Sequence, residues 1–187
     1  ADGIGWSLAG APVIVVERVM DIPDLTTPRL RLRAFVQADL DAYSAMSADA
    51  EVMRYIGEGH PVARDMAWRQ MAAFLGHWML RGYGMWALER RDDGRLIGRV
   101  GYLHPEGWPG LEIGWLLERA AWGQGYAREA ATAALAWGRG ERGLRQLISL
   151  IRAGNAASER LALHLGARLD GEVMMMGSPA NLFRYPD

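Results

Sequence analysis

The chain of 187 residues carries 21 Lys and Arg against 22 Asp and Glu, a formal net charge of −1. This balance gives no electrostatic reason to bind nucleic acid or an anionic membrane. The chain contains no cysteine, which excludes disulfides, thiolate metal sites and a cysteine nucleophile. Its apolar runs are shorter than the roughly 20 residues of a membrane span, and its histidines lack metal-ligand spacing. We expect a cytoplasmic protein without a metal centre.

The first residues, 1–24, are predicted to form an extension in front of one domain over residues 25–187. Within the extension, Val13–Val16 has strand propensity and could pair with a sheet edge or with a second copy of the chain. A homodimer is therefore left open. The segment Leu25–Pro28 reads as a turn that leads into the domain.

The first half of the domain is predicted to contain strands and helices in alternation. The segment Arg29–Arg33 alternates in the manner of a half-buried strand, with its leucines inward and its arginines outward. Asp39 is expected to cap a helix that carries Leu40, Tyr43 and Met46 on one face. The further expected elements are a helical piece at Asp49–Ile56, a helix at about Arg64–Leu80, and strands Met85–Arg90 and Leu96–Tyr102 joined by an Asp-Gly hairpin turn.

The second half predicts a parallel crossover in which a helix joins the strands Leu111–Leu117 and Leu147–Ile151. This helix carries a stripe of small residues that lets it lie close to a sheet. A later helix ends at Gly166, and two strands follow, Arg168–Met176 and Leu182–Tyr185, around a turn at 177–181. Met174–Met176 is expected to be buried. The stripe consists of Ala127, Ala130, Ala131, Ala134, Leu135 and Gly138.

Between the strand and the crossover helix lies a glycine loop, Trp122-Gly123-Gln124-Gly125-Tyr126-Ala127. Two glycines permit a tight turn, and the first N–H groups of a helix lack internal partners, so such a loop can bind phosphate oxygens. No Gly-Lys-Ser/Thr follows, which excludes a Walker loop. Arg128 stands where a dinucleotide fingerprint needs Gly or Ala. The glycines could also serve the turn alone.

In Gly125 and Ala127 the loop resembles the pyrophosphate loop of the GNAT superfamily of N-acetyltransferases. Trp122 departs from the usual Gln or Arg, but it matches the branch that resembles ribosomal-protein N-terminal (alanine) acetyltransferases. Ala162 stands where many members have a tyrosine acid, and Ala167 where an aromatic is usual. Three further segments resemble this branch in order along residues 25–185: Leu25–Arg33, Glu51–Gly57, and Asn155–Ser158 with the later Leu165-Gly166.

The resemblance implies an α/β fold, the GNAT acyl-CoA N-acyltransferase fold, with a mixed, mostly antiparallel sheet and CoA at the parallel crossover. It implies acetyl transfer from acetyl-CoA to a primary amine by direct attack. A protein or peptide N-terminus is the preferred acceptor, and a polyamine, amino acid or antibiotic is the alternative. The residues expected to bind acetyl-CoA are the loop residues Trp122, Gly123, Gln124, Gly125, Tyr126 and Ala127, the strand backbone at Leu116 and Leu117, and Asn155 and Ser158.

Two residues are candidates for the chemistry. The amine arrives as an ammonium ion and must lose a proton, and Glu112 is the candidate base because a carboxylate in an apolar strand is costly without a partner or a task. The alternative is an ion pair with Arg33 or Arg99, or exposure to water. Ser158 is the candidate acid by resemblance, with local hydrogen bonding in its helix as the alternative.

Other interpretations stay open. Trp86, Trp108 and Trp115 could line the acceptor cleft, although packing in the core is favoured for them. A chain that keeps the loop without turnover would be a CoA-binding sensor, which the alanine at position 162 leaves open. A nucleotide-binding α/β domain is a third reading, and it predicts stabilisation by NAD or ATP.

Overall fold

The computed structural model of the protein describes residues 22–187, so the predicted strand at Val13–Val16 lies outside the described residues. One eight-stranded sheet has the order β1-β2-β3-β4-β5-β6-β8-β7. Its ladders are antiparallel except for β5 and β6, which confirms the predicted mixed sheet with a parallel crossover. The elements are β1 (Leu25–Thr26), β2 (Leu30–Arg33), η1 (Gln37–Asp39), α1 (Leu40–Ala48), α2 (Ala50–Met53), α3 (Arg64–Arg81), β3 (Met85–Arg90), β4 (Leu96–Leu103), β5 (Glu112–Leu117), η2 (Arg119–Ala121), α4 (Tyr126–Gly140), β6 (Ile148–Arg152), α5 (Ala156–His164), β7 (Arg168–Met175) and β8 (Ser178–Arg184).

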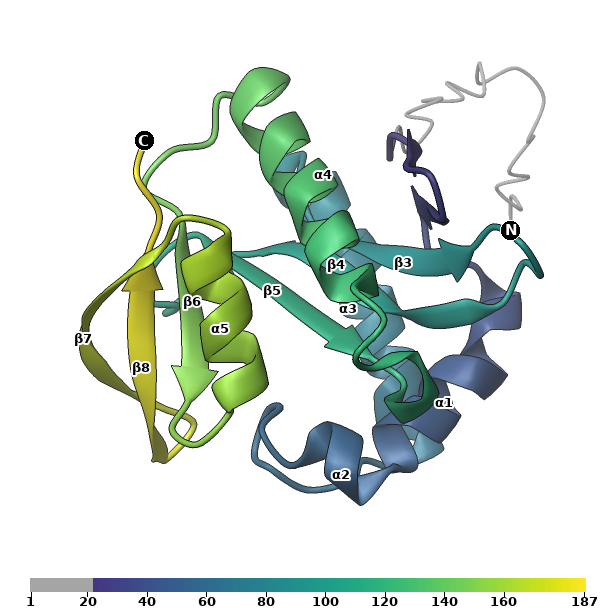
Figure 1. Cartoon of the computed structure of the whole chain (residues 1–187). Helices are drawn as coiled ribbons and strands as arrows, with labels where there is room; N and C mark the ends of the chain where they lie inside the picture. The colour runs from purple at the N-terminus through teal and green to yellow at the C-terminus, as the bar shows by residue number, and fades with distance from the viewer. Residues whose placement is uncertain (1–21) are drawn as a thin grey trace, which may run out of the picture.

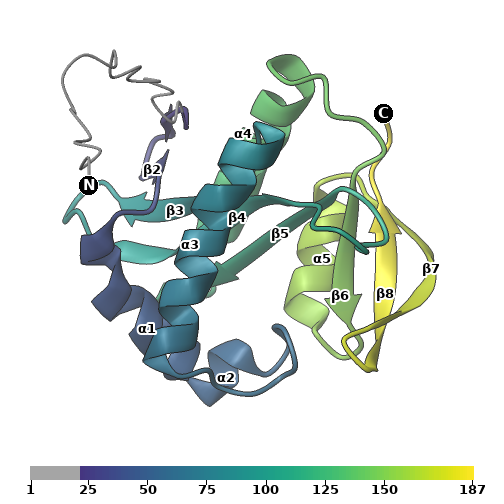
Figure 2. The same cartoon turned by 180° about the vertical axis from the view of Figure 1, so that it is seen from behind.

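Helices cover both faces of the sheet. α4 and α5 lie on one face (Figure 1), and α1, α2 and α3 lie on the other (Figure 2). The side chains of β3 alternate between the two layers: Trp86 and Leu88 join the cluster under α4, whereas Met85 and Ala87 join the cluster under α1 and α3. A strand buried on both faces is therefore apolar at successive positions. No helix among the described residues is both long and apolar enough to cross a bilayer.

Aromatic rings form the centre of the layer under α4. The ring centroids of Trp86 lie 4.8 Å from those of Trp78 and 4.9 Å from those of Trp137, both in edge-to-face arrangement. Trp86 is fully buried, so core packing, the favoured reading, is correct for this residue. The hydroxyl of Tyr102 donates to the Ala134 carbonyl of α4 at 2.7 Å. Burial raises the pKa of Tyr102 well above its usual value.

Five expectations about the elements are wrong. Asp39 is no side-chain cap: it ends η1, and its carboxylate accepts hydrogen bonds from Arg33 and from the Val36 N–H at 2.8 Å. Arg33 is consequently mostly buried rather than outward, paired with both Asp39 and Glu89. The segment Leu25–Thr26 is a strand on β2 rather than part of a turn.

The other two differences concern β7 and β8. Residues 178–181 belong to β8 instead of a turn, because they pair with both β6 and β7 and bury Ala180. Met174 and Met176 are 70% and 55% exposed, although they were expected to be buried. Met174 lies on β7, the edge strand of the sheet, and Met176 lies in the turn that follows it.

The close approach of α4 to the sheet depends on Gly138. A Cβ atom there would lie 2.1 Å from the Tyr102 hydroxyl oxygen, whereas a Cβ at Gly140 meets nothing within 4 Å. We expect Gly138→Ala to lower the free energy of unfolding by about 1–3 kcal/mol through overpacking. Gly140→Ala, the control in the same helix, should raise it by up to about 1 kcal/mol. Denaturant titration measures both. Equal stability of the two variants would contradict this account.

Candidate active site

The site begins where β5 and β6 separate. The two strands pair at one position, Glu112 with Ile148, and then diverge (Figure 1). On the side of the gap, Ser149 Oγ donates to the Ile113 carbonyl at 2.6 Å. On the opposite side, the Glu118 N–H donates to the Ile97 carbonyl at 2.9 Å. Because backbone groups alternate along a strand, the polar groups of Trp115 and Leu117 face the gap.

A cavity of about 510 Å³ lies in this gap between β5, α5 and the glycine loop. Gly123 and Gly125 have φ angles of +72° and +80°, the left-handed region that favours glycine. All the residues expected to bind the cofactor line this cavity except Gln124. The Gln124 side chain instead donates to the Ala120 carbonyl at 2.7 Å, and this hydrogen bond stabilises the conformation of the loop.

Side-chain contacts fix the conformation of the loop. Trp122 Nε1 donates to the Leu117 carbonyl at 2.9 Å. Arg29 Nη1 donates to the Gln124 carbonyl at 2.9 Å, Nε pairs with Glu129 at 2.7 Å, and the guanidinium lies 4.4 Å from the centre of the Tyr126 ring. The backbone of the loop is therefore fixed without use of the N–H groups of residues 123–127.

Those N–H groups remain available for a ligand. No described residue accepts a hydrogen bond from the backbone N–H groups of residues 123–128, which open α4. The positive end of the helix dipole lies at the same place. Arg54 and Arg128 line the cavity and add positive charge, and sequence analysis had assigned neither a role. This end of the cavity suits a diphosphate.

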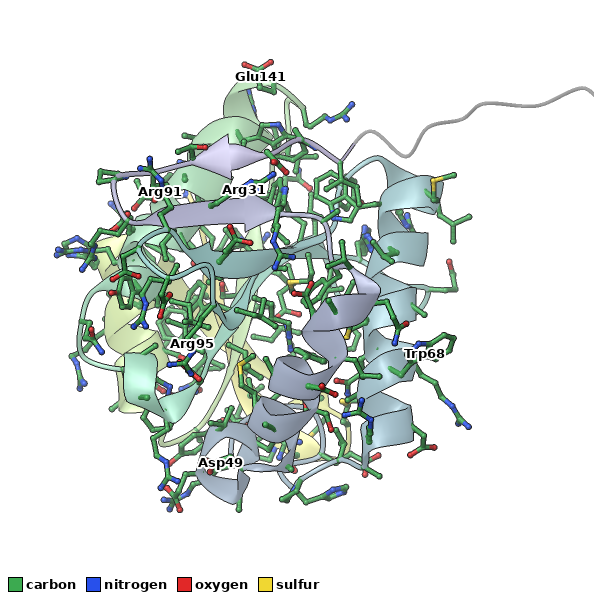
Figure 3. All side chains as sticks on the ribbon, turned by 90° about the vertical axis from the view of Figure 1, so that its right-hand side faces the viewer. Arg31, Asp49, Trp68, Arg91, Arg95 and Glu141 are labelled. Atoms are coloured by element: carbon green, nitrogen blue, oxygen red, sulfur yellow. The ribbon has the colours of Figure 1, made fainter. Side chains whose placement is uncertain are left out.

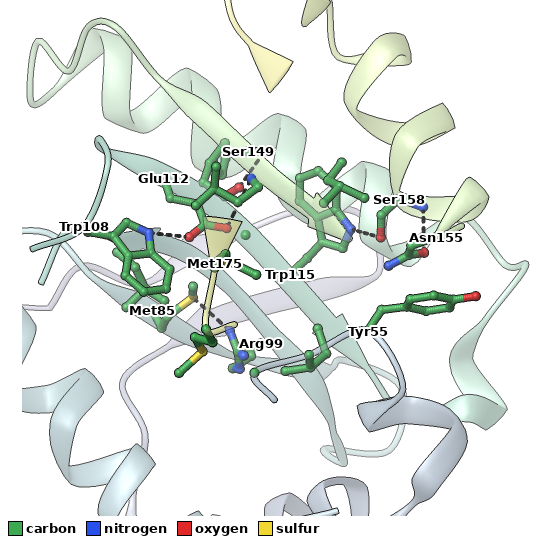
Figure 4. A pocket seen from close by; sticks show the side chains of 18 of the residues that line it. Tyr55, Met85, Arg99, Trp108, Glu112, Trp115, Ser149, Asn155, Ser158 and Met175 are labelled. Atoms are coloured by element: carbon green, nitrogen blue, oxygen red, sulfur yellow. Dashed lines mark hydrogen bonds between the residues drawn. The ribbon is translucent and has the colours of Figure 1, made fainter. Parts of the chain in front are cut away.

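A smaller cavity of about 240 Å³ opens on the α1 and α3 side of β5 (Figure 4). Its walls are mainly apolar and aromatic, and they include Trp108, Met175 and Met176. Glu112 and Arg99 supply its charged groups. The residues that line both cavities are Tyr55, Ile56, Trp115, Asn155 and Ser158.

Glu112 lies in the smaller cavity and is 9% exposed. Its Oε2 accepts a hydrogen bond from Trp108 Nε1 at 2.7 Å, and its Oε1 lies 3.4 Å from the Leu150 N–H (Figure 4). Burial raises the pKa of Glu112 to about 7, although these two hydrogen bonds and the charge of Arg99 favour the ionised form. Among the described residues, neither suggested arginine forms an ion pair with it, so the structural ion-pair reading is wrong.

Ser158 lies where the two cavities meet, in the first turn of α5. Its Oγ accepts a hydrogen bond from Trp115 Nε1 at 3.2 Å, and its N–H donates to Asn155 Oδ1 at 3.3 Å (Figure 4). Asn155 is therefore the N-cap of α5, as expected. Because the indole N–H uses an acceptor site on Oγ, the proton of the Ser158 hydroxyl stays free to be donated.

Two further features of this junction are not evident from the sequence. Tyr55 lines both cavities from the turn after α2, and its hydroxyl lies near Gly154 of the larger cavity. Trp108 is a cavity residue as considered, but its hydrogen bond to Glu112 was not foreseen. Ala162, the position where many GNAT members have a tyrosine, is fully buried in the core. Within residues 22–187, no group of three His, Asp or Glu side chains is placed to hold a metal ion.

Known proteins share this architecture. The family model described as an acetyltransferase (GNAT) domain matches residues 29–168. The uncharacterised protein YkkB of Bacillus subtilis is 30% identical over 167 residues, which cover 85% of this chain and 93% of YkkB. An acetyltransferase from Agrobacterium tumefaciens has a TM-score of 0.79 at 31% identity, with 89% of this chain and 95% of that chain covered. The ribosomal L7/L12 acetyltransferase RimL, in complex with coenzyme A, has a TM-score of 0.72 at 16% identity over 87% of this chain and 97% of RimL.

The likeness to RimL shows a shared fold. The match of the family model over most of the chain shows more, and it agrees with the diverging strands and the glycine loop. This chain belongs to the GNAT family of acetyltransferases and is an N-acetyltransferase.

Proposed function

We propose that acetyl-CoA binds in the larger cavity and that a primary amine enters from the smaller one, so that acetyl transfer takes place where the two cavities meet. The observation that carries this proposal is the position of Ser158 on both cavities, with Glu112 in one and the unpaired N–H groups of the loop in the other. Its support from outside the chain is the fold shared with RimL, which binds coenzyme A.

The residues divide the binding of acetyl-CoA between them. The N–H groups of residues 123–128 bind the diphosphate oxygens, and Arg54 and Arg128 lie near the negative charge. The backbone of Trp115 and Leu117 faces the gap and pairs with the amide groups of the pantetheine arm. The backbone of Leu116, expected in this role, pairs with β4 instead. This arrangement brings the thioester toward Ser158.

Glu112 and Ser158 then move the protons. The Glu112 carboxylate takes a proton from the ammonium group, and its pKa of about 7 suits a base that works near neutral pH. The nitrogen forms a bond to the acetyl carbon while the carbon–sulfur bond breaks. The Ser158 hydroxyl gives its proton to the leaving sulfur and is reprotonated with the second proton that the nitrogen releases. One proton per turnover passes from Glu112 to solvent.

The acceptor class follows from two lines of support. The segments that resemble ribosomal-protein N-terminal acetyltransferases favour a protein or peptide N-terminus. The volume of the smaller cavity, about 240 Å³, favours the first residue of such a peptide or a free small amine. A catalytically silent CoA sensor does not need a buried carboxylate of raised pKa, so Glu112 favours turnover over that alternative.

Ligand specificity separates acetyl-CoA binding from nucleotide binding. Acetyl-CoA at a concentration 100 times its dissociation constant should stabilise the protein by roughly 2.7 kcal/mol. NAD and ATP at the same concentration should stabilise it less, because neither extends along the gap beside β5. Thermal unfolding with each ligand measures this difference. Stabilisation by NAD or ATP without an effect of acetyl-CoA would contradict the proposal.

Turnover tests the two catalytic assignments. Glu112→Gln and Ser158→Ala should each lower kcat by roughly 100- to 10,000-fold, the range typical of a lost general base or acid. Release of thiol from acetyl-CoA with a panel of amines and peptides is the measurement. Ser47→Ala is the control, because Ser47 is a buried serine outside both cavities. Full activity of Ser158→Ala with a loss in Tyr55→Phe would transfer the acid role to Tyr55.

The pH dependence tests the environment of Glu112. Activity should rise as the pH increases through about 7, because the base must be ionised. Trp108→Phe removes a hydrogen bond that favours the carboxylate, so this limb should move to higher pH by roughly one to two units. The control is Trp68→Phe, whose indole is largely exposed. A limb that stays in place, or moves to lower pH, would show that Glu112 is not the titrating base.

A further inference from the structure

One charged group in the smaller cavity has no partner in the proposed reaction. Arg99 on β4 is only 9% exposed and lines the cavity. Its Nη1 lies 3.6 Å from Met85 Sδ, its guanidinium lies 5.1 Å from the centre of the Phe74 ring, and its buried Nε has no hydrogen-bond partner. No described carboxylate forms an ion pair with it. A buried guanidinium keeps its charge, so this arrangement is costly unless a ligand completes it.

The register of the sheet places Arg99 and Glu112 on the same face. Arg99 lies opposite Leu116, and Glu112 lies opposite Leu103. Leu116 and Glu112 are four residues apart on β5, so the guanidinium and the carboxylate start from positions roughly 13 Å apart along the strands. Between them Gly101 pairs with Gly114, and Gly114 lines the cavity without a side chain to fill it. In Figure 4, Arg99 lies near Met85 and Met175, and Glu112 lies next to Trp108.

Charge defines the ligand group that suits this end of the cavity. The pKa of Glu112 is raised to about 7, so this carboxyl group only partly balances the positive charge of Arg99 near neutral pH. The other residues that line the cavity are uncharged. The planar guanidinium presents parallel N–H donors, and a carboxylate accepts two such bonds at once. The cavity therefore suits a ligand with one carboxylate on Arg99, at a distance from the position of the amine.

We propose that the acceptor is an amine that carries a carboxylate, bound with its carboxylate on Arg99 and its nitrogen toward Glu112. This inference rests on the proposed function, because it names the substrate class of the same site. A free amino acid and a peptide that begins with an acidic residue both supply this chemistry. The cavity volume of about 240 Å³ suits the free amino acid, and the experiment distinguishes the two sources.

Matched acceptors test the wild-type enzyme. Leucine is compared with leucine amide and 3-methylbutylamine, and phenylalanine with phenylalanine amide and 2-phenylethylamine. Peptides that begin with Asp or Glu are compared with those that begin with Asn or Gln. Rates are corrected for the fraction of neutral amine. The enzyme uses either free amino acids or peptides as acceptors. Within the type that it uses, the carboxylate-bearing acceptor should have a kcat/KM roughly 10- to 100-fold higher than its uncharged partners, the range for a hydrogen bond to a charged group. Equal values within every pair would overturn the proposal.

Variants locate this preference at Arg99. Arg99→Met should raise KM for carboxylate-bearing acceptors roughly 10- to 100-fold relative to their uncharged partners. It should also move the pH limb of every acceptor upward, because the charge of Arg99 favours ionised Glu112. Arg99→Lys keeps the charge without the paired donors and should lie between these values. The control is Arg95→Met: Arg95 is 60% exposed at the β3–β4 turn (Figure 3). Loss of the preference in this control as well as in Arg99→Met would overturn the assignment. Acetyl-CoA affinity checks that each variant is folded.

Binding of a carboxylate without an amine gives a readout independent of turnover. Calorimetry with 4-methylpentanoate and 3-phenylpropanoate should show binding to the wild-type protein and to Arg95→Met, and binding at least roughly 10-fold weaker to Arg99→Met. No binding to the wild-type protein, or equal binding to Arg99→Met, overturns the proposal even where acetyl transfer is observed. Arg99-dependent binding of these acids without thiol release from any amine supports the carboxylate site and overturns the proposed function.

Discussion

The site depends on one event in the sheet: β5 and β6 pair at Glu112 and Ile148 and then part. From that position onward the backbone of β5 is paired on one side only, with β4. Unpaired backbone groups inside a protein are costly unless a ligand or a side chain satisfies them. In this protein Ser149 and Trp122 satisfy two carbonyls, and the remaining groups line a cavity. The departure from a regular sheet thus creates the binding surface.

The same strand serves each component of the reaction with a different part of its structure. Its backbone faces the larger cavity, Glu112 and Gly114 face the α1 and α3 layer, and Trp115 reaches the α5 layer and Ser158. Alternation along a strand separates these roles without a loop. A rigid element therefore holds both the proposed base and the partner of the proposed acid, which suits chemistry that needs fixed geometry.

The parts of the site that sequence predicted are local ones. Glycine at positions 123 and 125 indicates positive φ angles, and Asn155 is predicted as an N-cap from the helix that follows it. The parts it missed depend on pairing between distant segments. Arg99 shares a face with Glu112 because of the β4–β5 register, and Tyr55 arrives from a turn whose shape no periodicity encodes. Aspartate is a residue type that commonly caps helices, but the Asp39 carboxylate forms an ion pair with Arg33 instead. The expectation that Met174 is buried was wrong for a related reason: the sequence does not show which strand lies at the edge of the sheet.

The clamp from Arg29 onto the glycine loop has a consequence for assembly. Arg29 bonds to Glu129, a residue 100 positions away, and also to the carbonyl of Gln124. The loop therefore obtains its shape in part from a residue near the start of the domain. Closing so distant a contact is slow relative to helix formation. The coenzyme site should therefore form late in folding, and a bound ligand should in turn stabilise strands β1 and β2, whose connection carries Arg29.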